Sequence, residues 1–219
     1  MKVGLAGATG LVGGACAEIL QQESRVESIR SYGRRASCAS SPKLRFVQTD
    51  FSSFAADGGA PLDAAICALG STIRKAGSQQ AFFQIDHDFV LRFAARCREL
   101  GVRKFVLVSA MGADADSRFF YNQVKGAAER DLKQIGFESL VILQPSLLLG
   151  ERQESRFVEK LAITLAPLVQ SLLVGPLKAG RPIEAKRVAE TAVAALFHQT
   201  AKVELISNKK MLEGAWASK

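Results

Sequence analysis

The feature that most constrains the fold of this chain is a glycine-rich turn between two apolar segments near its start. Lys2–Ala6 is a short apolar run that stops at a glycine, and Leu11–Gln22 carries apolar residues at helical spacing. The turn between them reads Gly7-Ala-Thr-Gly10-Leu-Val-Gly13, with a glycine at every third position. This order predicts a strand, a tight turn and a helix, which is how many α/β folds begin.

The alternation of strand and helix patterns continues along the chain. We expect further strands at 26–32, 44–48, 63–69, 104–109, 139–143 and 203–206, and helices at 79–100, 120–135, 156–173 and 185–197. Such alternation over about 145 residues predicts an α/β fold, a Rossmann-type doubly wound parallel sheet. Ligands of these sheets bind at the carboxyl ends of the strands where the strand order reverses, here at the first and fourth strands. We expect one domain over 1–219, with a core of about 1–150 and a short C-terminal substrate-side portion at 151–219 that holds helices and the last strand.

The glycine-rich turn is typical of sites that bind the pyrophosphate of a dinucleotide. Its backbone can approach a phosphate closely, and the helix behind it presents unpaired N–H groups and a partial positive charge. The same pattern also joins strands to helices for steric reasons alone, but its place after the first strand favours the functional interpretation. We expect Gly13 to allow close packing of the helix on the strand. The residues assigned to cofactor binding are Gly7, Ala8, Thr9, Gly10, Leu11, Val12 and Gly13.

The residues about twenty positions after the turn predict which dinucleotide binds. An acidic residue there accepts the ribose hydroxyls of NAD, whereas arginine suits the 2′-phosphate of NADP. This chain has Arg34 and Arg35 at that place, and no Asp or Glu between Ile29 and Ser41. A solvated loop is the alternative interpretation. We expect NADP(H) to be preferred over NAD(H).

Two further strand ends complete the expected cofactor site. Asp50 and Phe51 follow the third strand, where they would meet the adenine end of the cofactor, Phe51 by contact with the ring. Ala68, Leu69 and Gly70 end the fourth strand and would let the nicotinamide half pass over it.

A serine, a tyrosine and a lysine follow the fifth strand in an order that suits proton transfer. Ser109 ends that strand, and Tyr121 and Lys125 lie four residues apart in the next predicted helix, so both side chains lie on one face. A nearby ammonium stabilises a phenolate and brings the pKa of a tyrosine down from about 10. We expect Tyr121 to act as acid or base, Lys125 to assist it and hold the nicotinamide ribose, and Ser109 to hydrogen-bond the substrate oxygen.

These motifs resemble the short-chain dehydrogenase/reductases, and most closely an atypical branch that contains the Tat-interacting-protein oxidoreductase. The resemblance covers nearly the whole chain and rests on the turn, on Tyr121-x-x-x-Lys125-Gly, and on the segments 67–72, 108–114, 144–146 and 149–156. It implies an oxidoreductase that acts on a carbonyl or an alcohol, with Pro145, Ser146 and Leu147 beside the nicotinamide. Many relatives carry asparagine where this chain has Asp86, and a carboxylate there still allows Lys125 to be oriented.

Two other functions fit the same motifs. A sensing protein would bind NADP(H) and change its affinity for a protein partner with little or no turnover, as the resemblance to this branch suggests. A sugar-nucleotide epimerase or dehydratase would share the turn and the Ser/Tyr/Lys set. Only about 75 residues follow the sixth strand, however, which leaves little room for a nucleotide-sugar domain.

Composition narrows the classes of partner. The chain has 219 residues and a formal net charge of +8, with basic residues spread along it and with two tyrosines and one tryptophan, so we expect no nucleic-acid site. Its cysteines form no C-x-x-C pair, so we expect neither a metal site nor a disulfide framework.

The apolar segments narrow the location. No apolar run reaches the ~20 residues that span a bilayer, and the first apolar segment is too short for a secretory signal. We therefore expect no membrane association and a cytoplasmic monomer or homodimer that takes a small-molecule substrate.

Overall fold

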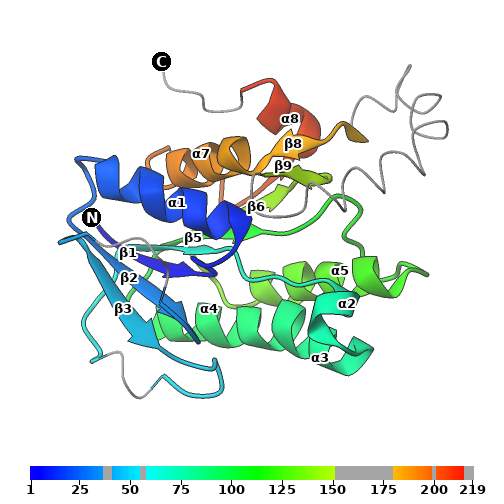
Figure 1. Cartoon of the computed structure of the whole chain (residues 1–219), viewed down its shortest axis with the longest axis horizontal. Helices are drawn as coiled ribbons and strands as arrows, with labels where there is room; N and C mark the ends of the chain where they lie inside the picture. The colour runs from blue at the N-terminus through cyan, green and yellow to red at the C-terminus, as the bar shows by residue number, and fades with distance from the viewer. Residues whose placement is uncertain (37–40, 55–57, 151–179, 199–200, 215–219) are drawn as a thin grey trace.

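The computed structural model describes residues 1–36, 41–54, 58–150, 180–198 and 201–214 (Figure 1). Its centre is a seven-stranded sheet in which all neighbouring strands are parallel, in the order β3-β2-β1-β4-β5-β6-β9. The strands are β1 (Lys2–Ala6), β2 (Ser28–Gly33), β3 (Leu44–Gln48), β4 (Ala64–Cys67), β5 (Lys104–Val108), β6 (Ser139–Gln144) and β9 (Val203–Ser207). The order reverses between β1 and β4, where the predicted ligand site lies. This topology confirms the predicted Rossmann-type α/β fold.

Helices cover both faces of the sheet. Helices α1 (Leu11–Gln22) and α7 (Ala185–Ala195) lie side by side on one face, whereas α4 (Phe89–Glu99) and α5 (Phe120–Lys133) cover the other (Figure 1). The remaining described elements are the short helices α2 (Ile73–Ala76), α3 (Gln79–Phe83) and α8 (Asn208–Leu212), a π-helical turn (Gln84–Asp88) and a small second sheet of β7 (Leu148–Leu149) and β8 (Ile183–Glu184). A sheet covered on both faces explains why β5 is apolar along nearly its whole length.

Two apolar cores result, one under each pair of helices. The first joins α1 and α7 to the sheet, and Leu20 and Val188 are fully buried in it. The second is rich in aromatic rings, with fully buried Phe93 of α4 and Phe105 of β5 at 6.0 Å between ring centroids. Burial of a side chain of this size contributes about 1.5–3 kcal/mol. The two cores therefore hold the ends of the central strands in fixed positions.

The predicted elements that fall within the described residues recur in the structure, and one of them is divided. The helix expected over 79–100 is divided, because a π-helical turn at Gln84–Asp88 separates α3 from α4. The last strand joins the main sheet beside β6 and α7 packs on α1, so the described residues after 180 complete the sheet and its cover. The helix expected over 156–173 lies outside the described residues.

Candidate active site

The loop from β1 to α1 leaves no room for side chains at two of its glycines. Gly7 has a φ of +91°, and a Cβ built on it would lie 2.4 Å from the carbonyl oxygen of Ala68. A Cβ on Gly13 would lie 2.1 Å from the carbonyl oxygen of Gly7, so α1 packs directly on the turn. Gly10 precedes α1 without a side-chain cap, which leaves the first amides of the helix open to an anion. The turn therefore fits a pyrophosphate.

A cleft of about 540 Å³ lies at the carboxyl ends of β1, β4, β5 and β6. Predicted site residues that line it are Gly10, Leu11, Val12, Ala68, Leu69, Gly70, Ser109, Tyr121, Lys125, Pro145, Ser146 and Leu147. Lining residues to which the sequence analysis assigned no catalytic or cofactor-binding role are Ser71, Thr72, Lys75, Val108, Ala110, Met111 and Leu148. Segments far apart in the chain thus meet in one cavity beside the glycine-rich turn.

A buried ion pair lies at this cleft. Nζ of Lys125 is 2.7 Å from Oδ1 of Asp86, and the two side chains are 7% and 0% exposed. The backbone N–H of Ser71 donates to Oδ2 of Asp86 at 2.9 Å. Burial alone would lower the pKa of Lys125, but the charge of Asp86, with a contribution from Tyr121, holds that pKa above its ordinary value. Lys125 is therefore an ammonium in the folded protein.

Tyr121 lies one helical turn before Lys125 in α5, on the same face. Its ring stacks on the buried ring of Phe82 from α3, with 5.4 Å between the centroids. Both Tyr121 and Lys125 line the cleft, and the two side chains are close enough to interact electrostatically. The phenol is thus held between an aromatic wall and a cation.

The Ser109 hydroxyl is bound to a glutamate that the sequence analysis did not single out. Its Oγ donates to Oε1 of Glu129 at 2.5 Å, and Nε2 of Gln144 donates to both carboxylate oxygens, at 3.0 and 3.1 Å. Glu129 is buried, and it lies four residues after Lys125 on the same face of α5. The regular four-residue spacing of Tyr121, Lys125 and Glu129 is the feature of the sequence that could have pointed to Glu129. The hydroxyl of Ser109 has a single proton, and this hydrogen bond directs it to Glu129.

The segment after β6 is held by a second unforeseen residue. Asn208 is buried, and its Oδ1 accepts from the backbone N–H of Ser146 at 3.0 Å while its Nδ2 donates to the carbonyl of Arg181 at 2.8 Å. The Ser146 hydroxyl donates to the same carbonyl. Asn208 and Ser146 are 62 residues apart, and no sequence pattern marks this link. It fixes Pro145, Ser146 and Leu147 at the cleft.

The strand ends assigned to the adenine half lie outside this cleft. Arg34 and Arg35 follow β2 and are exposed, and neither forms an ion pair among the described residues. Asp50 is exposed and accepts from the N–H and hydroxyl of Ser52. Phe51 departs from the expectation: it is 3% exposed, with φ of +64°, because its ring packs in the aromatic core against the rings of α4. Its ring is therefore not presented to an adenine.

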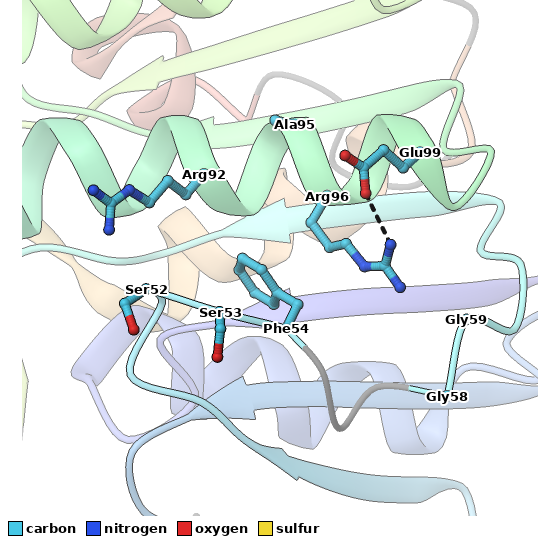
Figure 2. Close-up of a pocket in the computed structure, with 9 residues that line it drawn as sticks. All are labelled: Ser52, Ser53, Phe54, Gly58, Gly59, Arg92, Ala95, Arg96 and Glu99. Carbon is cyan, nitrogen blue, oxygen red and sulfur yellow. Dashed lines mark hydrogen bonds and ion pairs between the residues drawn. The ribbon is translucent and has the colours of Figure 1, made fainter.

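A second cavity, with a volume of about 540 Å³, lies between α4 and the loop that follows β3. It is lined by Ser52, Ser53, Phe54, Gly58, Gly59, Arg92, Ala95, Arg96 and Glu99, and an ion pair of 2.8 Å joins Arg96 to Glu99 (Figure 2). The end of α4 lies beside the start of β4, where the N–H of Leu62 donates to the carbonyl of Leu100. This cavity contains no residue of the predicted site.

The cysteines of the described chain are core residues. Cys16, Cys67 and Cys97 are buried free thiols, and Cys38 lies outside the described residues. Burial raises the pKa of Cys16 and of Cys67 to about 12. Such thiols are protonated at neutral pH and are poor nucleophiles.

His87 bridges two helical segments. Its ring nitrogens lie 2.8 Å from Asp88 and 3.0 Å from Asp131 of α5, and its ring stacks on Phe83.

Within the described ranges, no three His, Cys, Asp or Glu side chains gather as metal ligands. No helix of the same ranges is long and apolar enough to cross a membrane.

Comparison with known proteins agrees with this geometry. A family model described as NAD(P)H-binding matches residues 7–199. The chain belongs to this NAD(P)H-binding family. This chain is 33% identical to "Protein FMP52, mitochondrial" of Eremothecium gossypii, over 97% of this chain and 96% of that protein. It is 39% identical to "Protein fmp52, mitochondrial" of Emericella nidulans, over 74% of this chain and 72% of that protein.

These relatives correct one expectation. A cytoplasmic location was expected, but the curated relatives are named mitochondrial proteins, so that expectation is wrong. The expectation rested on the lack of a secretory signal and of a bilayer-spanning run, and neither feature separates the cytoplasm from a mitochondrial compartment.

Solved structures show the same fold. "MoeE5 in complex with UDP-glucose and NAD" superposes with a TM-score of 0.69 at 15% identity, over 97% of this chain and 80% of that chain. The oxidoreductase ylbE from Lactococcus lactis gives a TM-score of 0.67 at 17% identity, over 100% of this chain and 98% of that chain. At these identities the likeness shows the fold alone, which is Rossmann-like and is shared with oxidoreductases of the short-chain dehydrogenase type.

Proposed function

We propose that this family member is an NADP(H)-dependent oxidoreductase that interconverts a carbonyl and an alcohol. The observation that carries the proposal is the single cleft in which Tyr121 and the Lys125 ammonium lie beside the glycine-rich turn. The turn residues would hold the pyrophosphate, and Lys125 would hold the nicotinamide ribose. When bound, the cofactor supplies or accepts the hydride at the substrate carbon.

Tyr121 moves the proton in this proposal. Its hydroxyl gives a proton to the substrate oxygen during reduction and takes one during oxidation, and the Lys125 ammonium stabilises the phenolate that forms. Phe82 keeps the ring in place. Ser109 lines the same cleft, but its proton is committed to Glu129, so we assign the donated hydrogen bond at the substrate oxygen to Tyr121.

The preference for NADP(H) rests on Arg34 and Arg35. Both guanidinium groups are exposed just after β2, at the strand end where the adenosine ribose of a Rossmann-type site lies. Neither is neutralised by an ion pair among the residues described, so both charges are available to a 2′-phosphate.

The lining of the cleft guides the choice of substrate. Met111 and Leu147 line the cleft and are 45% and 54% exposed, so the cleft offers accessible apolar surface that a ligand could cover. Apolar aldehydes and ketones should therefore head the substrate panel, ahead of nucleotide sugars.

The decisive experiment measures NADPH oxidation with this panel for wild type and Tyr121→Phe. Loss of a general acid should lower kcat by about 10²–10⁴-fold. NADPH affinity, measured by fluorescence, should stay within about twofold because the phenol ring is retained. Equal turnover in the two proteins would exclude the proposed role of Tyr121.

A second candidate is the NADP(H)-sensing interaction protein. The observation that favours it is Phe119, a large aromatic side chain that is 75% exposed and lies two residues before Tyr121. Pull-downs with and without NADPH, for wild type and Phe119→Ser, would test it. A partner that binds only one cofactor state and is lost in the variant would support sensing. Identical partners in all four samples would count against it.

A further inference from the structure

We propose that the outer edge of β9 is an interaction surface for a second copy of this chain, on which two β9 strands pair antiparallel about a two-fold axis. Within the described parts of the chain, β9 is the last strand of the sheet and pairs with β6 alone. Such an edge presents a row of backbone N–H and C=O groups with which another strand can pair. The proposal does not depend on the proposed function, because its test needs no turnover.

Apolar side chains of β9 continue the aromatic core to this edge. Val203 is in register with Leu140, and Leu205 is in register with Ile142, so each pair lies on one face of the sheet. Leu140 and Ile142 are 2% and 0% exposed in that core, whereas Val203 and Leu205 are 39% and 42% exposed. The apolar row is therefore covered as far as β6 and open at β9, where a partner strand would extend its cover.

The opposite edge of the sheet differs. Its last strand, β3, carries no large apolar side chain that is exposed, although all five of its residues are described. Arg45, the second residue of that strand, is exposed. A charged side chain on an edge strand is a common protection against pairing with another chain. Of the two edges, β9 is the one that fits a partner.

The hydrogen bonds between β9 and β6 determine which backbone groups of β9 face outward. The Leu140 N–H donates to the carbonyl of Lys202 at 3.0 Å, and Leu140 is in register with Val203. In a parallel ladder, this arrangement directs the N–H and C=O of Val203 to the outer edge. Two Val203 residues related by a two-fold axis can then exchange both N–H···O=C bonds, as directly opposite residues do in an antiparallel pair.

The charges of β9 favour a second copy in the register centred on Val203. In that register, Lys202 of each copy lies opposite Glu204 of the other, in a non-hydrogen-bonded pair whose side chains are close. Lys202 is exposed, Glu204 is half-buried, and neither forms an ion pair with another described residue. The two-fold axis thus makes two opposite-charge pairs from one strand. A register centred on Leu205 would instead place Glu204 opposite Ile206.

The proposed interface adjoins a support of the cleft. Ser207 ends β9, and its side chain caps α8 by accepting from the N–H of Lys210. Asn208, the first residue of α8, accepts from the Ser146 N–H at 3.0 Å. A partner on β9 would therefore hold the strand that leads directly into the residue fixing the segment after β6.

A charge-exchange series tests the pairing, with the mass in solution measured by sedimentation equilibrium over a range of protein concentrations. Wild type should reach twice the mass of one chain. Lys202→Glu and Glu204→Lys each place like charges opposite in both symmetric pairs, so each should weaken the dimer by about tenfold or more. The double variant Lys202→Glu/Glu204→Lys restores opposite charges and should restore the dimer. Arg45→Glu, on the opposite edge strand, is the matched control and should keep the wild-type affinity.

The backbone contribution is tested by comparing Val203→Pro, which removes the outward N–H, with Val203→Thr, which keeps it. The proline variant should be monomeric and the threonine variant dimeric. Equal dimer affinity in these two variants would overturn the proposal. So would a wild type that stays monomeric, a dimer that neither charge reversal weakens, or a double charge variant no more dimeric than the single ones. If the proline variant fails to fold, the charge exchange still decides.

Discussion

Removing Glu129 should destabilise the protein through two polar groups that lose their acceptor. In Glu129→Ala, the Ser109 hydroxyl and the Gln144 amide no longer have the carboxylate to which they donate. A buried polar group left unpaired costs about 1–3 kcal/mol. Ser109 is 7% exposed and bears this cost fully, whereas half-buried Gln144 can turn towards water. We expect a loss of about 2–4 kcal/mol, or roughly 4–16 °C in Tm for a chain of this size.

The assay is urea unfolding followed by circular dichroism, with Glu138→Ala as the matched control. Glu138 is exposed, so its truncation should change the free energy of unfolding by less than about 0.5 kcal/mol. Ser109→Ala and the double variant complete a cycle, in which the two losses should overlap by about 1 kcal/mol or more because they remove one hydrogen bond. Additive losses, or a Glu129→Ala protein as stable as the control, would refute the reasoning.

Three further predictions concern the cofactor and the proton. Gly13→Ala places a Cβ 2.1 Å from the carbonyl oxygen of Gly7, so α1 must move away from the turn. The affinity for NADPH, measured by fluorescence, should therefore fall at least tenfold. An unchanged affinity would contradict the packing argument. The Arg34→Ala/Arg35→Ala double variant should weaken NADPH binding by roughly 10- to 100-fold and leave NADH binding unchanged. Arg92→Ala, which removes another exposed arginine, is the control. An equal loss of affinity for both cofactors would refute recognition of the 2′-phosphate. Ser109→Ala should lower kcat far less than Tyr121→Phe, because Ser109 already donates to Glu129, and equal losses would show that Ser109 donates to the substrate.

The fold could be predicted because its elements have strong local signals. Apolar β5, the glycine-rich turn and the apolar stripe of α1 each fix one element and its position in the chain. The helix over 79–100 was predicted as continuous, since a π-helical turn has the same apolar spacing to within one residue. Asp86 in this turn pairs with Lys125 of α5, a contact between segments 39 residues apart that local spacing does not reveal.

The candidate site was predictable where its residues follow strand ends or share a helix face. Tyr121 and Lys125 are an example, and Glu129 extends their spacing by one more turn, so it could have been found. Asn208 could not, because its contact with Ser146 is formed only in the folded chain. Phe51 was misjudged because an aromatic residue after a strand suits an adenine and a core equally well. The packed rings of α4 settle its place.

The packing of α7 on α1 has a consequence for the order in which the protein can mature on the ribosome. The apolar face of α1 is complete early in synthesis, but part of its cover comes from Ala185–Ala195. Until that segment has left the exit tunnel, the first helix and the turn before it lack a finished core. We expect nascent chains that end near residue 150 to stay sensitive to protease and to bind no dinucleotide. In this fold, the glycine-rich turn is synthesised well before the segment that completes the core beneath α1.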